Sequence, residues 1–92
     1  MAKNEFERVE EAPDDALTLL IGMSGDKLVG AVNCPATAAP GRLPKDYASG
    51  QMSGREALQS AVKLANELKA PIVVMDPQNV WPEEWGVLYV TE

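Results

Sequence analysis

The amino-acid sequence predicts an α+β (or small α/β) fold of the order ββαββ, in which one mixed or antiparallel four-stranded sheet carries a single long helix on one face. Three observations predict this fold. Residues 53–71 contain the start, the apolar stripe and the stop of one helix; residues 72–75 form a short apolar run directly after it; and residues 17–33 have the pattern of a β-hairpin.

The helix is the best-defined element. Ser53 and Glu56 have the spacing of a capping box. In this motif the serine side chain accepts a hydrogen bond from the Glu56 amide, and the Glu56 carboxylate accepts one from the Ser53 amide. Pro71 disfavours helical backbone at the residue before it and cannot continue the hydrogen-bond ladder. Between these signals, apolar residues recur with the period of an amphipathic helix, at Ala57, Leu58, Ala61, Val62, Leu64, Ala65 and Leu68. We therefore predict a helix over residues 54–69.

Four strands are expected around this helix. Residues 17–22 and 27–33 are two apolar runs separated by a turn that contains Gly25 and Asp26, which is typical of a hairpin. One face of this hairpin is apolar, and Leu20, Val29 and Ala31 make the other face partly apolar as well. The run at 72–75 is too short for a helix and suits a buried strand, and residues 87–91 alternate weakly as a final strand.

The connectivity then predicts the strand directions. A strand, a helix and a second strand joined in series normally run parallel, so the strands at 27–33 and 72–75 are expected to be parallel. The link before residues 87–91 is too short for another crossover helix, which predicts a last strand antiparallel to 72–75. The carboxyl ends of the strands at 27–33 and 72–75 and the start of the helix would then share one edge of the sheet, where α/β proteins tend to bind ligands.

The chain divides into an acidic N-terminal segment and one domain. In residues 1–16, acidic side chains outnumber the basic Lys3 and Arg8, and Pro13 interrupts the segment, so we expect a flexible arm. Residues 17–92 are expected to form a single α/β domain. Within it, residues 34–52 are rich in proline and glycine and lack periodicity, which predicts a long loop.

Composition excludes several classes of function. The chain has 92 residues, a net charge of −6, no histidine and one cysteine, Cys34. Neither a Cys/His metal site nor a histidine-activated nucleophile can be assembled within such a chain, so we expect no catalytic residues, no metal and no cofactor. Lysine and arginine do not cluster as nucleic-acid binding requires. Since no apolar run is long enough for a membrane span or a secretory signal, we expect a cytoplasmic protein that binds neither nucleic acid nor membrane.

One candidate site lies at the predicted edge of the sheet. Backbone amides at the start of a helix attract anions, and Gly54 beside the Arg55 guanidinium would let a carboxylate or phosphate approach both. The expected site comprises Ser53, Gly54, Arg55, Cys34 and Asp76. The same residues have a structural interpretation, which we favour: a capped helix with an exposed arginine, a buried unreactive thiol and a turn residue that ends a strand.

A second candidate site is aromatic. Trp81 and Trp85 lie four residues apart in a turn-rich segment, and Tyr89 follows in the last predicted strand. Such residues are enriched in protein interfaces, although at least one tryptophan of so small a domain is expected to be structural. We therefore predict a non-enzymatic protein-interaction or self-associating module, with a homo-oligomer or another protein as its partner. The alternative is a binder of a small anionic ligand at the start of the helix.

Overall fold

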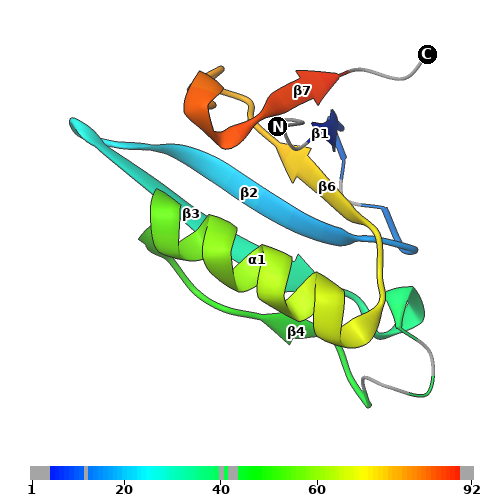
Figure 1. Ribbon diagram of the computed structural model, residues 1–92. Helices are drawn as coiled ribbons and strands as arrows, with labels where there is room; N and C mark the ends of the chain where they lie inside the picture. The colour runs from blue at the N-terminus through cyan, green and yellow to red at the C-terminus, as the bar shows by residue number, and fades with distance from the viewer. Residues whose placement is uncertain (1–4, 12, 40, 42–43, 90–92) are drawn as a thin grey trace.

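The computed structural model describes residues 5–11, 13–39, 41 and 44–89, which form one mixed sheet with a single α-helix on one face (Figure 1). The seven strands of the sheet are β1 (Glu5–Arg8), β2 (Leu17–Ser24), β3 (Lys27–Cys34), β4 (Tyr47–Ala48), β5 (Met52–Ser53), β6 (Ile72–Met75) and β7 (Val87–Tyr89). The helix α1 spans Gly54–Leu68, and two 3-10 turns, η1 (Ala36–Ala38) and η2 (Glu83–Trp85), lie in the connections. The strand order is β4-β3-β2-β6-β1-β7, and β5 also pairs with β3.

The hairpin, the helix and the strand after the helix are confirmed. The strands β2 and β3 pair antiparallel through seven residue pairs, from Thr18–Asn33 to Ser24–Lys27. The helix begins where Ser53 Oγ accepts from the Glu56 amide at 3.2 Å. It ends before Lys69, whose left-handed backbone (φ 54°) donates its amide to the Ala65 carbonyl.

The expected number of four strands is wrong, and one reason lies in the N-terminal segment. Residues 5–8 form β1, which pairs in parallel with β6 on one side and with β7 on the other. The expectation of a flexible arm is therefore wrong for these residues, while residues 1–4 and 12 lie outside the described part. Only alternate residues of a strand face the core, so the single apolar residue Phe6, which is 5% exposed, suffices to anchor a segment that is otherwise charged.

The expected loop at 34–52 accounts for the other additional strands. Cys34 still belongs to β3, and β4 and β5 pair antiparallel with β3 at its two halves. The chain therefore returns along β3 before α1 starts. Residues 40, 42 and 43 are outside the described part.

Two predicted strand directions are also wrong. The strand β2, not β3, is parallel to β6, so β3 runs antiparallel to β6. Because β4 and β5 bring the chain back along β3, α1 begins beside the first half of β3 instead of continuing from its end. The last strand, β7, is parallel to β1 and hence to β6, because strands of three and four residues are short enough for residues 76–86 to return without a long helix.

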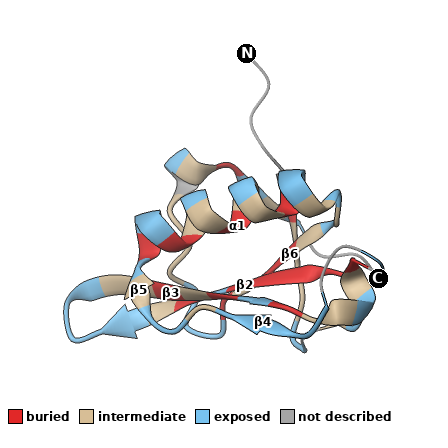
Figure 2. Cartoon of the chain, turned by 90° about the horizontal axis from the view of Figure 1, so that it is seen from below, coloured by how far each residue is buried: buried red, intermediate tan, exposed pale blue. Residues whose placement is uncertain are grey.

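The core lies between α1 and the sheet, as Figure 2 shows. The helix meets the sheet with its small residues Ala57, Ala61 and Ala65, all buried. The strand β3 beneath these alanines has a glycine, Gly30, at the point of contact. A Cβ atom added to Gly30 would lie 2.8 Å from Ala57 Cβ. The absence of a side chain at Gly30 therefore sets how closely the helix approaches β3. Among the described helices, none has the length and apolar character that a membrane crossing needs.

The opposite face of the sheet, which we call the α1-free face, is covered unevenly. Its middle is buried, since Thr18 is 1% and Val73 6% exposed, and the Thr18 hydroxyl has no hydrogen-bond partner among the described residues. Larger apolar side chains on either side of this middle are open to solvent. Leu20 on β2 is 42% exposed, and Val87 and Tyr89 on β7 are 44% and 45% exposed.

We expect Gly30→Ala to lower the free energy of unfolding by about 1–3 kcal/mol, because the new methyl group must push α1 away from β3. Gly22→Ala is the matched control, since the nearest atom to its added Cβ is the flexible end of Gln78 at 3.3 Å. Urea unfolding followed by circular dichroism measures both. Equal losses for the two variants would contradict a close contact between helix and strand at Gly30.

Candidate functional site

The five residues of the first candidate site do not lie together. The start of α1 is beside the first half of β3, because Ser53 pairs with Val29, whereas Cys34 is the last residue of β3. Asp76 follows β6, whose last residue pairs with Leu20, so Asp76 lies level with the start of the second half of β2. Since β3 is antiparallel to β2, Cys34 lies at the end of the sheet opposite both the helix start and Asp76. The expectation that Cys34 shares their edge is wrong, and the reversed direction of β3 is the reason.

Cys34 is surrounded by the core. Its side chain is fully buried, and its Sγ lies 3.7 Å from the Pro35 carbonyl as a weak donor. Burial raises the pKa of the Cys34 thiol, and the negative charge of Asp46 raises it further. Both effects oppose the thiolate, which is the nucleophilic form. Cys34 therefore acts as a small apolar residue.

The start of α1 is filled by the protein's own side chains. Ser53 Oγ is used in the helix cap. Gly54 is buried so tightly that an added Cβ would lie 2.7 Å from Leu28 Cγ and 3.2 Å from the ring of Trp85. Arg55 points to solvent and is followed by the acidic Glu56. Anion binding at this helix start stays a prediction.

Asp76 organises the segment that follows β6. Its side chain is 2% exposed, and its two carboxylate oxygens accept from the backbone amides of Val80 and Trp81, each at 2.9 Å. Its own carbonyl accepts from the Asn79 amide and from Arg8 Nη2 at 2.8 Å. Three of these four bonds close the turn at 76–81 and the fourth joins it to Arg8 of β1, so the carboxylate is a structural group.

The aromatic candidates separate into two places. Trp81 packs edge-on against Phe6 and Trp85, with ring centroids 5.4 and 5.3 Å apart, and its Nε1 donates to the Gly86 carbonyl. Both tryptophans are half-buried and pack against the core on the α1 side. Tyr89 lies on the α1-free face instead, because its neighbour Leu88 is the residue of β7 that turns to the core. The three residues do not form one surface.

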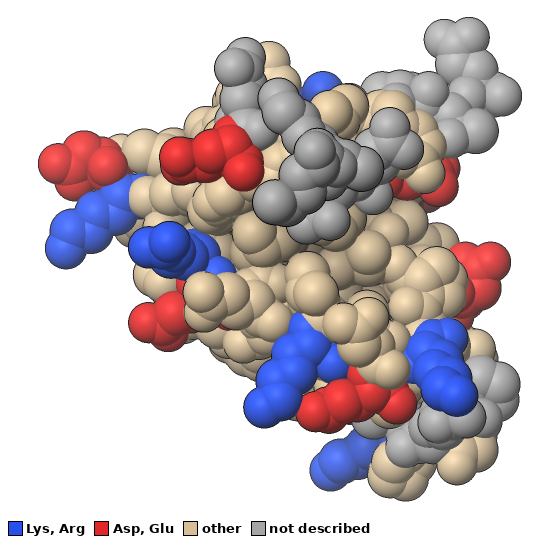
Figure 3. Space-filling view, in the orientation of Figure 1, with Lys and Arg blue, Asp and Glu red and all other residues tan. Residues whose placement is uncertain are grey.

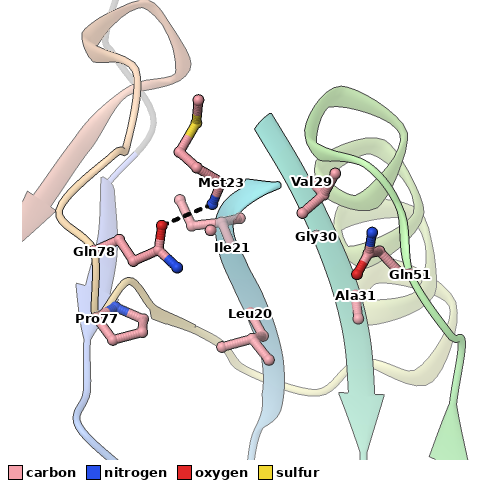
Figure 4. Close-up of a pocket in the computed structure, with 10 residues that line it drawn as sticks. Leu20, Ile21, Met23, Val29, Gly30, Ala31, Gln51, Pro77 and Gln78 are labelled. Atoms are coloured by element: carbon pink, nitrogen blue, oxygen red, sulfur yellow. Dashed lines mark hydrogen bonds between the residues drawn. The ribbon is translucent and has the colours of Figure 1, made fainter. Parts of the chain in front are cut away.

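A hollow of about 290 Å³ on the α1-free face was not among the sequence-based candidates (Figure 4). Its aliphatic walls come from the hairpin, through Leu20, Val29 and Ala31, and the amides of Gln51 and Gln78 flank it. All of the described residues that line it are uncharged. The signal in the sequence was the apolar character of Leu20, Val29 and Ala31 on the second face of the hairpin.

A second hollow of about 300 Å³ adjoins the first at Pro77 and contains Arg8, Glu10 and Met75. The two hollows lie where the parallel strands β1, β6 and β2 reach their carboxyl ends. This is the edge where ligands of α/β sheets tend to bind, but here the first hollow offers aliphatic surface and two amides.

The remaining chemistry of the described residues is sparse. No group of three or more Cys, Asp or Glu side chains among them converges into a set that could hold a metal ion. On the α1 side of the described part, basic and acidic side chains are interspersed (Figure 3). No protein-family model, curated protein or solved structure matches this chain.

Replacing Asp76 by alanine should lower the free energy of unfolding by about 2–5 kcal/mol, because two buried backbone amides lose their acceptor. Asp76→Asn keeps one oxygen and should lose less. The matched control is Asp46→Ala, since Asp46 is exposed and, among the described residues, accepts from one backbone amide, that of Ala36. Urea unfolding followed by tryptophan fluorescence measures all three. If Asp76→Ala is no more harmful than Asp46→Ala, Asp76 does not hold the turn.

The raised pKa of Cys34 predicts a pH dependence of stability. Above about pH 8.5 the thiol of the unfolded chain ionises while the folded one stays protonated, so the contribution of Cys34 is complete below that pH and is lost as pH rises through the folded pKa. The difference in unfolding free energy between wild type and Cys34→Ala should therefore shrink from pH 8 to pH 10, by at most about 1.4 kcal/mol per pH unit. A constant difference would show that the thiol titrates normally in the fold.

Proposed function

We propose that this protein is a non-enzymatic protein-interaction module that binds its partner through the α1-free face. The observation that carries the proposal is the exposure of large apolar side chains there. Of the five large hydrophobic residues that are exposed in the described part of the chain, Leu20, Val87 and Tyr89 lie on this face. An exposed apolar residue is ordinary when it stands alone, but Leu20 forms a wall of an uncharged hollow, which adds concave shape to exposure.

The positions of the reactive residues support a binding role. Both carboxylate oxygens of Asp76 accept hydrogen bonds from backbone amides, and Cys34 is buried with a raised pKa. Both groups are therefore occupied in structural roles. The hollow over the hairpin on the α1-free face instead offers aliphatic walls and amides, which suit the side chain of a protein partner.

Site-specific photo-crosslinking in the native cells tests this function. The crosslinking residue p-benzoylphenylalanine is placed at Leu20 or at Tyr89, both exposed on the α1-free face, and at Gln59 as the control on the solvent side of α1. We expect discrete adducts from positions 20 and 89 in several-fold higher yield than from position 59. An adduct with the mass of two chains would identify the partner as a second copy.

Two results would contradict the proposal. Adducts of equal yield from all three positions would mean that crosslinking reports random encounter. No adduct from positions 20 and 89, in a protein that is expressed and folded, would mean that the α1-free face is not an interface.

A further inference from the structure

The strand β2 is longer than its neighbour β6. Their parallel pairing runs from Leu17–Ile72 to Leu20–Met75 and stops there, whereas β2 continues to Ser24. The chain after β6 reaches Pro77, which has no N–H to continue the ladder. On this side, therefore, residues 21–24 of β2 have no strand beside them among the described residues, although β3 still pairs with their other side.

The backbone of Met23 faces this gap. Residues two apart in a strand direct their N–H and C=O groups to the same side. The Leu17 amide donates to the Pro71 carbonyl on the β6 side, so Ile21 and Met23 also direct their backbone groups to that side. The Ile21 amide still belongs to the ladder of the Leu20–Met75 pair, so the edge without a neighbouring strand among the described residues runs from the Ile21 carbonyl to Met23.

A side chain fills the gap in place of a strand. Gln78 extends toward β2 and its Oε1 accepts from the Met23 amide at 2.9 Å (Figure 4). A primary amide carries the same donor and acceptor as a peptide group, so Gln78 stands in for one peptide of a missing strand. Both Met23 and Gln78 are exposed, so this bond can exchange without opening the core.

The space beside this bond is made by Gly22. It has no side chain on the α1-free face, and an added Cβ there would lie 3.3 Å from Gln78 Nε2. The hollow therefore reaches the free edge, with Leu20, Val29 and Ala31 forming its apolar wall. A segment that replaced the Gln78 amide could place an apolar side chain over Gly22.

From this geometry we infer that the edge from Ile21 to Met23 binds an extended segment of another protein by strand addition, with the Gln78 amide as the group that it displaces. The inference rests on the proposed interaction function and names the kind of partner. The segment pairs its backbone with β2 and inserts one apolar side chain into the hollow.

Charge selects among extended segments. The chain carries a net charge of −6, whereas the hollow itself is lined by uncharged residues. Long-range attraction therefore favours a segment whose apolar residues alternate with lysine or arginine, and it opposes both an acidic segment and a second copy of this chain. The occupant is thus a basic, alternating strand of a different protein.

The capped peptide Ac-KVKVKVK-NH2 is the probe, titrated into the isotopically labelled full chain and followed by NMR. We expect the largest shifts at the Met23 backbone amide and at the Gln78 side-chain amide. Gln78→Ala should tighten binding about two- to tenfold, because the peptide no longer competes with a hydrogen bond that stabilises by roughly 0.5–1.5 kcal/mol. Gln59→Ala, on the solvent side of α1 and away from the hollow, should leave the affinity unchanged.

Two further peptides separate backbone pairing from charge. Ac-EVEVEVE-NH2 should not bind. The basic peptide is also made in two N-methylated forms, each methylated at alternate residues so that one edge of the extended peptide loses its N–H donors. Both forms keep the charge and the side chains. The form methylated along the edge that pairs with β2 should lose binding. If both methylated forms bind like the parent, or if Met23 and Gln78 do not shift, strand addition at this edge is wrong. Shifts confined to Leu20, Val87 and Tyr89 would also contradict strand addition at this edge. The crosslinking experiment tests the interaction function separately.

Discussion

The way in which the chain leaves β6 determines much of this structure. Asp76 turns its carboxylate inward and holds the amides of Val80 and Trp81. This turn places Trp81 against Phe6 of β1 and Trp85 against Gly54 at the start of α1. One buried carboxylate therefore connects the N-terminal strand, the C-terminal segment and the helix, although these lie far apart in the sequence.

Local signals made a large part of the fold predictable from the sequence. The helix carries its own cap, apolar stripe and stop, and the hairpin carries its turn, so neither depends on distant contacts. The strand β1 could not be found in this way. Its residues are mostly charged, and its place in the sheet comes from pairing with β6 and β7, with only Phe6 to anchor it.

The predicted grouping of the candidate site residues is wrong where it depends on the direction of a strand or on its register with its neighbours. Cys34 was placed beside the helix start by assuming that β3 leads directly into a crossover, but β4 and β5 bring the chain back along β3 first. The hollow was indicated by Leu20, Val29 and Ala31 on the second face of the hairpin. What no local pattern could show is that β6 ends four residues before β2, because that depends on the register Leu20–Met75.

The same register limits how strongly the α1-free face can bind. Exchanging the Gln78 amide for a partner's peptide group replaces one hydrogen bond by another, so the gain in free energy is close to zero. One aliphatic side chain buried in the hollow contributes about 1.5–3 kcal/mol, whereas association costs at least about 4 kcal/mol in lost translation and rotation. These contributions alone do not exceed the cost of association, so binding at the edge depends on the added attraction between a basic segment and the net negative charge of the chain, and it is weak and reversible. A tight complex would also have to cover Val87 and Tyr89, which lie beyond β6 and β1 on the same face.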